Sequence, residues 1–209
     1  MTPQSLYWLG FIFADGTIVD RINGSPELAI VLSEKDARHV EKFKLFLKSS
    51  HKIINVNVNG FPGSKNAKRF AIRSIKLTND IKGFGWKKHL NSIAKPQIAD
   101  SPHFWRGVID GDGWVGINKT QNSPCLQLVG GYPLLSQFVK YIHSVYPAYN
   151  GSVRPHKSIF TVELSGCTAF AIIKNLYSNP LVVLERKYNA AINIKTLGLQ
   201  RLGLSVEAA

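Results

Sequence analysis

Two similar apolar segments stand out in the hydrophobic pattern of this 209-residue chain, one near its N-terminus and one just past its middle. Each begins behind a hydroxyl residue followed by proline, at Thr2-Pro3 and at Ser101-Pro102, which is a sequence signal for the start of a helix. Each ends on an Asp-Gly pair, and the two copies are offset by 97 residues. The pattern therefore predicts two equivalent helices and an internal duplication.

After each predicted helix, the chain alternates between apolar and polar residues with the period of a strand, and then shows the wider spacing of an amphipathic helix. In the first half this predicts strands at 17–22 and 27–33, a helix at 34–49, strands at 53–59 and 68–76, and a short helix at 78–84. In the second half it predicts strands at 114–119 and 125–129, a helix at 134–145, strands at 152–156 and 159–164, and a helix at 168–177. The predicted fold class is α+β, with halves at 1–85 and 101–197, a basic connector at 86–100 and a tail at 198–209.

The two apolar segments share small residues as well as the final acid: WLGFIFADG occupies 8–16 and WRGVIDGDG occupies 105–113. Gly10 and Gly107 fall inside the predicted helices, where glycine costs about 0.5–1 kcal/mol relative to alanine, so a compensating reason is expected. We predict that the two helices pack against each other and that their backbones approach closely at these glycines.

Asp15 and Asp112 fall at the carboxyl ends of the two helices, where the helix dipole disfavours a carboxylate. An isolated Asp-Gly pair is usually turn chemistry, but two copies in register favour a shared role. If the helices pack side by side and parallel, the two acids meet at one end and raise each other's pKa unless a cation lies between them. Oxygen ligands of this kind favour Mg²⁺, whose coordination is completed by water and substrate phosphate.

Both segments resemble the motif of the LAGLIDADG homing endonucleases, and the resemblance covers nearly the whole chain. It implies two pseudo-symmetric αββαββα domains that pack through parallel motif helices, with antiparallel sheets forming a DNA-binding saddle. It also implies that Asp15 and Asp112, together with Ala14 and Gly111, bind Mg²⁺ or Mn²⁺. Ca²⁺ is expected to bind without supporting cleavage.

One position departs from the family pattern. Phe13 stands where the second copy has Asp110 and where the family usually has its first acid. Because the penultimate residue of the motif is the family's metal ligand, the departure leaves the predicted metal site intact. Asp110 is expected to be a helix-terminus or interface residue rather than a catalytic one.

The family also places a lysine near each active centre, where it could stabilise charge on the scissile phosphate or orient the attacking water. The segment LERKY resembles the family's closing motif and gives Lys187 as the matching lysine; in the first half Lys88 is favoured over Lys87, and that choice stays open. Solvated surface lysines are the alternative on so basic a chain. A polar residue that positions water is expected after the second strand, at Glu34, whereas the matching position of the second half is Gly131, so we predict two unequal centres.

The charge balance points to a polyanionic partner, because 26 Lys and Arg against 13 Asp and Glu give a net charge of +13. Double-stranded DNA is the leading prediction; a membrane surface is the alternative, but the basic residues are dispersed rather than clustered. Since no 18-residue apolar run and no signal-peptide layout occurs, we expect a soluble intracellular protein of the bacterial cytoplasm or an organelle. Two cysteines, in no metal-ligand spacing, exclude a zinc finger.

Strand alternation in the first half places Asn55, Asn57 and Asn59 on one face, which is unusual because asparagine is depleted in strands. Asparagine can pair bidentately with adenine in the major groove, where a two-stranded ribbon fits; a solvated face is the alternative for any single residue. Arg69 and Arg73 share a face of the next predicted strand. The predicted DNA contacts are Arg21, Asn55, Asn57, Asn59, Arg69, Arg73, Asn118, Gln127, Arg154 and His156.

The predicted function is a monomeric, sequence-specific DNA endonuclease of the homing type. By resemblance it hydrolyses one phosphodiester in each strand across the minor groove of a long target site and leaves short 3′ overhangs. The alternative is a non-cleaving nucleic-acid-binding protein on the same scaffold, either an RNA maturase or a DNA-binding regulator. Retention of both acids argues against a regulator, whereas a maturase could retain them, so an assay has to separate the two.

Overall fold

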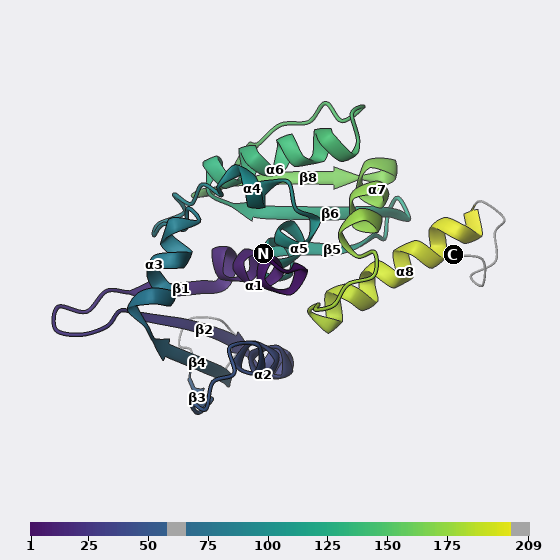
Figure 1. Cartoon of the computed structure of the whole chain (residues 1–209). Helices are drawn as coiled ribbons and strands as arrows, with labels where there is room; N and C mark the ends of the chain where they lie inside the picture. Colours follow the sequence, from purple (N-terminus) through teal and green to yellow (C-terminus); the bar gives the residue numbers. More distant parts are fainter. Residues whose placement is uncertain (58–65, 202–209) are drawn as a thin grey trace.

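Two antiparallel sheets flank a central pair of helices in the computed structural model, which describes residues 1–57 and 66–201 (Figure 1). The first half consists of α1 (Pro3–Asp15), β1 (Gly16–Val19), β2 (Glu27–Ser33), the 3-10 turn η1 (Glu34–Asp36), α2 (Ala37–Phe46), β3 (Ile54–Val56), β4 (Ala67–Arg73) and α3 (Ile75–Gly83). After α4 (Pro96–Ala99), the second half consists of α5 (Pro102–Asp112), β5 (Gly113–Asn118), β6 (Ser123–Gly130), α6 (Tyr132–Val145), β7 (Arg154–His156), β8 (Ile159–Ser165), α7 (Gly166–Leu176) and α8 (Glu185–Arg201). The predicted α+β class and the order αββαββα in each half are confirmed.

Each sheet buries one face beneath helices. The strand orders are β1-β2-β4-β3 and β5-β6-β8-β7, so the two halves share one topology. In β2, Leu28, Ile30 and Leu32 alternate onto the buried face, which α2 covers, and α6 and α7 cover the second sheet in the same way (Figure 1). We call the opposite face of each sheet its open face.

The two motif helices start as their sequences predict. The Thr2 hydroxyl accepts a hydrogen bond from the Ser5 backbone N–H at 3.1 Å, and the Ser101 hydroxyl accepts one from the His103 N–H at 3.2 Å. Most residues of both helices are buried, which agrees with their central place between the sheets. Each helix ends at a glycine with extended backbone, so a strand follows directly.

Gly10 and Gly107 form the predicted close contact between α1 and α5. An ideal Cβ on Gly10 would lie 2.0 Å from the carbonyl oxygen of Phe104, and one on Gly107 would lie 2.0 Å from that of Tyr7. Further along, a Cβ on Gly111 would lie 2.4 Å from that of Ala14. The contacts advance along both helices together, so the helices are parallel and their carboxyl ends meet.

The connector between the halves is held against the second half. The side-chain amide of Gln137 in α6 accepts from the Ala94 backbone N–H at 2.8 Å and donates to the Ala94 carbonyl at 2.7 Å. A Cβ on Gly131 would lie 1.8 Å from the carbonyl oxygen of Leu90, so a side chain is excluded there. The missing polar side chain at Gly131 therefore makes room for the connector.

The sequence analysis did not predict the last helix, α8. Ala191 and Ile194 are fully buried at helical spacing, and a Cβ on Gly198 would lie 2.4 Å from the ring of Phe170 in α7. Because α8 runs to Arg201, the tail expected from residue 198 begins as helix, and residues 202–209 lie outside the described part. Within residues 1–57 and 66–201, no helix is long and apolar enough to cross a membrane.

Candidate active site and nucleic-acid interface

Asp15 and Asp112 lie side by side at the carboxyl ends of the two central helices. A Cβ on Gly111, next to Asp112, would be 3.2 Å from the Asp15 Oδ2 atom. Burial and then the negative charge of Asp112 raise the pKa of Asp15 to about 7. Burial raises the pKa of Asp112 to about 6, against the opposing charge of Lys187. Without a cation, the pair therefore holds a proton near neutral pH.

Lys187 lies beside the two acids but uses its donors on a helix end. Its Nζ atom donates to the carbonyl oxygens of Ile109, Asp110 and Gly111 at 2.7, 2.6 and 3.0 Å. The residue is 3% exposed, and burial lowers its pKa to about 8. Since a lysine has three N–H donors, this one caps the carboxyl end of α5 and fixes the position of Asp112.

An ion pair that the sequence did not indicate joins the two halves next to Asp15. The Nε atom of Arg186 donates to both carboxylate oxygens of Asp36, at 3.1 and 3.2 Å. The charge of Arg186 lowers the pKa of Asp15, and the charge of Asp36 raises it. The predicted residue Glu34 is instead exposed and pairs with Lys68 at 3.3 Å. Asp36, two residues later, is the acid after β2 that lies near the centre.

Lys88 lies on the connector, in a pocket at the end of α1. Its Nζ atom is 3.7 Å from a carboxylate oxygen of Asp20, and its side chain is half exposed. Lys87 and Lys88 line a pocket of about 420 Å³ together with Phe13 and Ala14. Both lysines are therefore within reach of the end of α1, and the preference for Lys88 over Lys87 stays a prediction.

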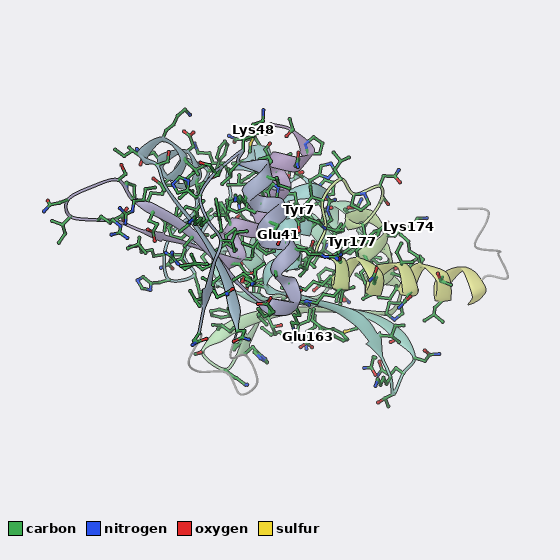
Figure 2. The ribbon with its side chains drawn as sticks, turned by 90° about the horizontal axis from the view of Figure 1, so that it is seen from below. Tyr7, Glu41, Lys48, Glu163, Lys174 and Tyr177 are labelled. Atoms are coloured by element: carbon green, nitrogen blue, oxygen red, sulfur yellow. The ribbon has the colours of Figure 1, made fainter. Side chains whose placement is uncertain are left out.

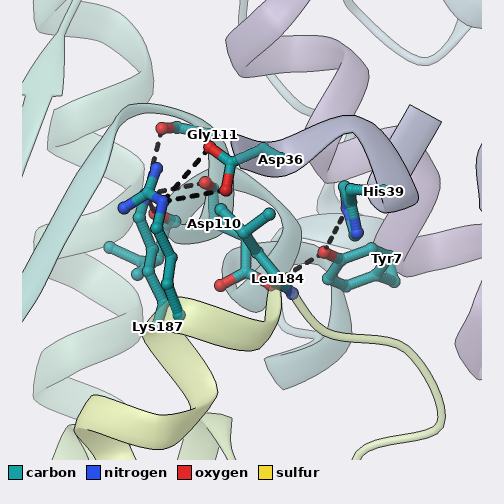
Figure 3. A network of polar contacts seen from close by, with 9 residues as sticks. Tyr7, Asp36, His39, Asp110, Gly111, Leu184 and Lys187 are labelled. Atoms are coloured by element: carbon teal, nitrogen blue, oxygen red, sulfur yellow. Dashed lines mark hydrogen bonds and ion pairs between the residues drawn. The ribbon is translucent and has the colours of Figure 1, made fainter. Parts of the chain in front are cut away.

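Asp110 is the centre of a buried polar network between the halves (Figure 3). Its carboxylate accepts from the hydroxyls of Tyr7 and Tyr177 at 2.7 and 2.6 Å and from the Leu184 backbone N–H at 2.7 Å. The Tyr7 hydroxyl also lies 2.9 Å from the His39 Nε2 atom. Tyr7 and Tyr177 lie close together in the middle of the molecule (Figure 2). The interpretation of Asp110 as an interface residue is confirmed.

The strand register places Arg69 and Arg73 together on the open face of the first sheet but removes Asn55 from it. Residues directly opposite each other share a face, and Arg69 is opposite Ile54, whereas Asn55 is opposite Lys68. Asn55 therefore faces away from the arginines, because the pairing of β3 turns its apolar residues toward them, and the predicted DNA contact of Asn55 stays a prediction. Asn57 is exposed after the strand, and Asn59 lies outside the described residues.

The three predicted arginines of the first half converge on one carboxylate. Arg21 and Arg73 donate to the Oε2 atom of Glu27 at 3.0 and 3.4 Å, and Arg69 donates to Oε1. Glu27 is 8% exposed. Burial alone would raise its pKa, but the hydrogen bonds and charges of Arg69 and Arg21 bring the pKa below its ordinary value. Glu27 was missed because its partners come from different elements: Arg21 lies in the loop after β1, and Arg69 and Arg73 lie on β4.

On the second sheet, four predicted contacts have different environments. Gln127 is on the open face with Trp114 and donates to the Glu163 carboxylate at 2.7 Å. Arg154 and His156 belong to β7, at the edge of the same sheet. The Asn118 side chain accepts from two backbone N–H groups of the following turn, so it stabilises the β5–β6 hairpin.

Comparison with known proteins gives a fold but no sequence relative. No protein-family model and no curated protein matches the chain. The homing endonuclease I-WcaI, solved bound to its DNA recognition sequence, matches with a TM-score of 0.65 and 15% identity over 89% of this chain and 85% of that one. The LAGLIDADG meganuclease I-AabMI, bound to uncleaved DNA, matches with a TM-score of 0.60 and 16% identity over 99% and 95%. This chain has the LAGLIDADG fold.

The paired acids of this LAGLIDADG fold fit a divalent cation. Two carboxylates with raised pKa values meet at the negative ends of two helices, an arrangement that a cation stabilises. Among the residues that the structure describes, no cluster of three or more His, Cys, Asp or Glu offers a closed site. An ion held by only two carboxylates needs water and phosphate to complete its shell, which is the usual behaviour of Mg²⁺. Ala14 and Gly111 are the other two predicted metal-binding residues, and the carbonyl oxygen of Gly111 already accepts a hydrogen bond from Lys187.

Proposed function

We propose that this protein is a sequence-specific DNA endonuclease of the homing type, active as a monomer, which hydrolyses one phosphodiester in each strand and leaves short 3′ overhangs. One observation carries the proposal: Asp15 and Asp112 meet at the touching ends of two parallel helices, between two sheets with open faces. A protein that only binds DNA has no need of two half-buried acids placed side by side.

In the proposed reaction, Asp15 and Asp112 hold Mg²⁺ or Mn²⁺ near the two scissile phosphates. When bound there, the ion would supply an activated water and stabilise charge on the leaving oxygen. Lys187 keeps the end of α5, and with it Asp112, in a fixed position. Arg186 is bound to Asp36 through its Nε atom, so its two terminal nitrogens are oriented donors for a phosphate near Asp15. Lys88 is proposed for the same task on the connector side.

The open faces are the proposed DNA surface. They carry the arginines around Glu27 in one half and Gln127 with Arg154 in the other. The net charge of +13 provides the sequence-independent part of binding, because neutralised phosphates release counterions. I-WcaI and I-AabMI, the similar structures, were both solved with DNA, which supports this choice of partner.

The test is cleavage of DNA that contains a target obtained by binding selection from random duplexes. The parental protein should cut both strands in Mg²⁺ and neither in EDTA. Asp15→Asn and Asp112→Asn should each reduce double-strand cleavage at least about a hundredfold while specific binding in Ca²⁺ is retained, because an oriented ligand is lost from the reacting centre. Asp100→Asn removes an equal charge from an exposed residue just before α5 and should cleave at the parental rate.

The alternatives give different results in the same assay. Parental cleavage by either Asp→Asn variant would remove that acid from the proposed centre. Specific DNA binding without cleavage in any divalent metal would favour a DNA-binding regulator, and selection of RNA over DNA would favour a maturase.

A further inference from the structure

Glu27 is an acid in an unexpected place, on the open face of a protein with a net charge of +13. It is the first residue of β2, lies opposite Arg73 of β4 and is 8% exposed. A carboxylate on a surface that meets phosphates repels them, so its presence needs a reason other than affinity.

The reason is in the geometry of the three arginines. Arg21 and Arg73 donate to one carboxylate oxygen of Glu27 and Arg69 to the other, while their side chains remain 41, 59 and 30% exposed. A guanidinium has five N–H donors, and each arginine uses only a few of them to bind Glu27. Arg69 and Arg73 also line a pocket of about 380 Å³ with His51, Lys52 and Ile54, which leaves room for an approaching group.

An unrestrained surface arginine binds whichever phosphate is nearest, and such contacts carry no sequence information. Reading a guanine edge requires two N–H groups in a fixed plane, and an ordered side chain loses less entropy on binding. A carboxylate that holds three guanidinium groups in one cluster restricts their binding to the nearest phosphate and favours the reading of base edges.

We propose that Glu27 is a specificity-determining residue, which positions Arg21, Arg69 and Arg73 to read base edges and keeps them from binding phosphates independently. The inference rests on the proposed function only for DNA as the ligand, since binding can be measured without cleavage. Glu27 touches no base in this account; it acts through the arginines.

The experiment compares Glu27→Gln with Glu41→Gln, which removes the same charge from an exposed position on α2 (Figure 2). Affinities for a selected target and for unrelated duplex DNA are measured in Ca²⁺ over a range of salt. For Glu27→Gln we expect the ratio of specific to nonspecific affinity to fall about tenfold, the loss of one bidentate contact. The log–log salt slope for unrelated DNA should steepen by about 0.9 for each arginine that moves to a phosphate. Glu41→Gln should keep the parental ratio.

Thermal melting of both variants separates this role from a merely structural one. A Glu27→Gln protein that melts lower but discriminates like the parent would show that the cluster only stabilises the sheet, and would overturn the inference. If Glu27→Gln does not fold, Arg73→Lys replaces it, because this side chain is 59% exposed and the change keeps the charge. A selection profile unchanged by Arg73→Lys at every target position would equally overturn the proposal.

The proposed function fails differently from this inference. If the parental protein prefers no DNA sequence, sequence-specific recognition itself is wrong, and the role of Glu27 with it. If the parent discriminates and Glu27→Gln discriminates equally well, only the inference is wrong.

Discussion

The close contact between α1 and α5 predicts how much stability is lost when a methyl group is added at Gly107. In Gly107→Ala, the new methyl would lie 2.0 Å from the Tyr7 carbonyl oxygen and 2.7 Å from the Phe11 backbone nitrogen. Contacts of this kind need about 3.5 Å, and helix backbone cannot rotate aside, so α1 and α5 must separate by more than about 1 Å. Overpacking costs about 1–3 kcal/mol, and a clash with backbone belongs at the upper end. Subtracting a helix-propensity gain of about 0.5–1 kcal/mol leaves about 2 kcal/mol of destabilisation.

For a chain of this size, that loss lowers the melting temperature by about 4–8 °C, measured by circular dichroism. The matched control is Gly83→Ala at the end of α3, where a Cβ meets nothing within 4 Å. This change should stabilise the protein by about 0.4–1 kcal/mol, because alanine restricts the unfolded chain. If Gly107→Ala melted as high as Gly83→Ala, close packing would not explain the motif glycine. Cleavage should fall together with stability in Gly107→Ala, since the separation displaces Asp15 from Asp112.

Two further predictions concern the acids Asp15 and Asp110. The folded-state pKa of Asp15, about 7, lies above its ordinary value of 3.8, so its contribution to stability is complete below pH 3.8 and is lost as the pH rises through 7. Between pH 5 and 7.5 the free energy of unfolding of the metal-free protein, measured in urea, should therefore decrease, and this decrease should be smaller in Asp15→Asn. A parental profile as flat as that of the variant would contradict the raised pKa of Asp15. In Asp110→Asn, the new amide N–H would face one of the three donors to Asp110, which are the Tyr7 hydroxyl, the Tyr177 hydroxyl and the Leu184 N–H. The free energy of unfolding, measured in urea, should fall by about 1–3 kcal/mol. An unchanged free energy of unfolding would mean that the network does not stabilise the interface.

The motif helices and the strand order could be predicted because their signals are local. Thr2 and Ser101 cap the helices within three residues, and the alternation of Leu126, Gln127 and Leu128 in β6 marks its buried face. The two glycines in register predicted the close packing of the helices, and the family resemblance implied that they are parallel.

What the sequence could not predict depends on which distant residues meet. Asp36 and Arg186 are 150 positions apart, and no local pattern links them. The side on which Asn55 lies relative to Arg69 could not be predicted, because alternation gives the two faces of a strand but not which of them the neighbouring strand shares. In the sequence, Glu27 is an ordinary charged residue at the start of a strand, and only the fold shows that three arginines from elsewhere in the chain bind it.

The network around Asp110 also limits how this protein can be recombined. Tyr7 and His39 come from the first half, whereas Asp110, Tyr177 and the Leu184 N–H come from the second. A chimaera that joins one half to a foreign partner would leave either a buried carboxylate short of donors or a buried tyrosine without its acceptor. Exchange of halves to create new target sites should therefore succeed only when residue 7 and residue 110 are transferred as a matched pair, even though neither faces the open sheets.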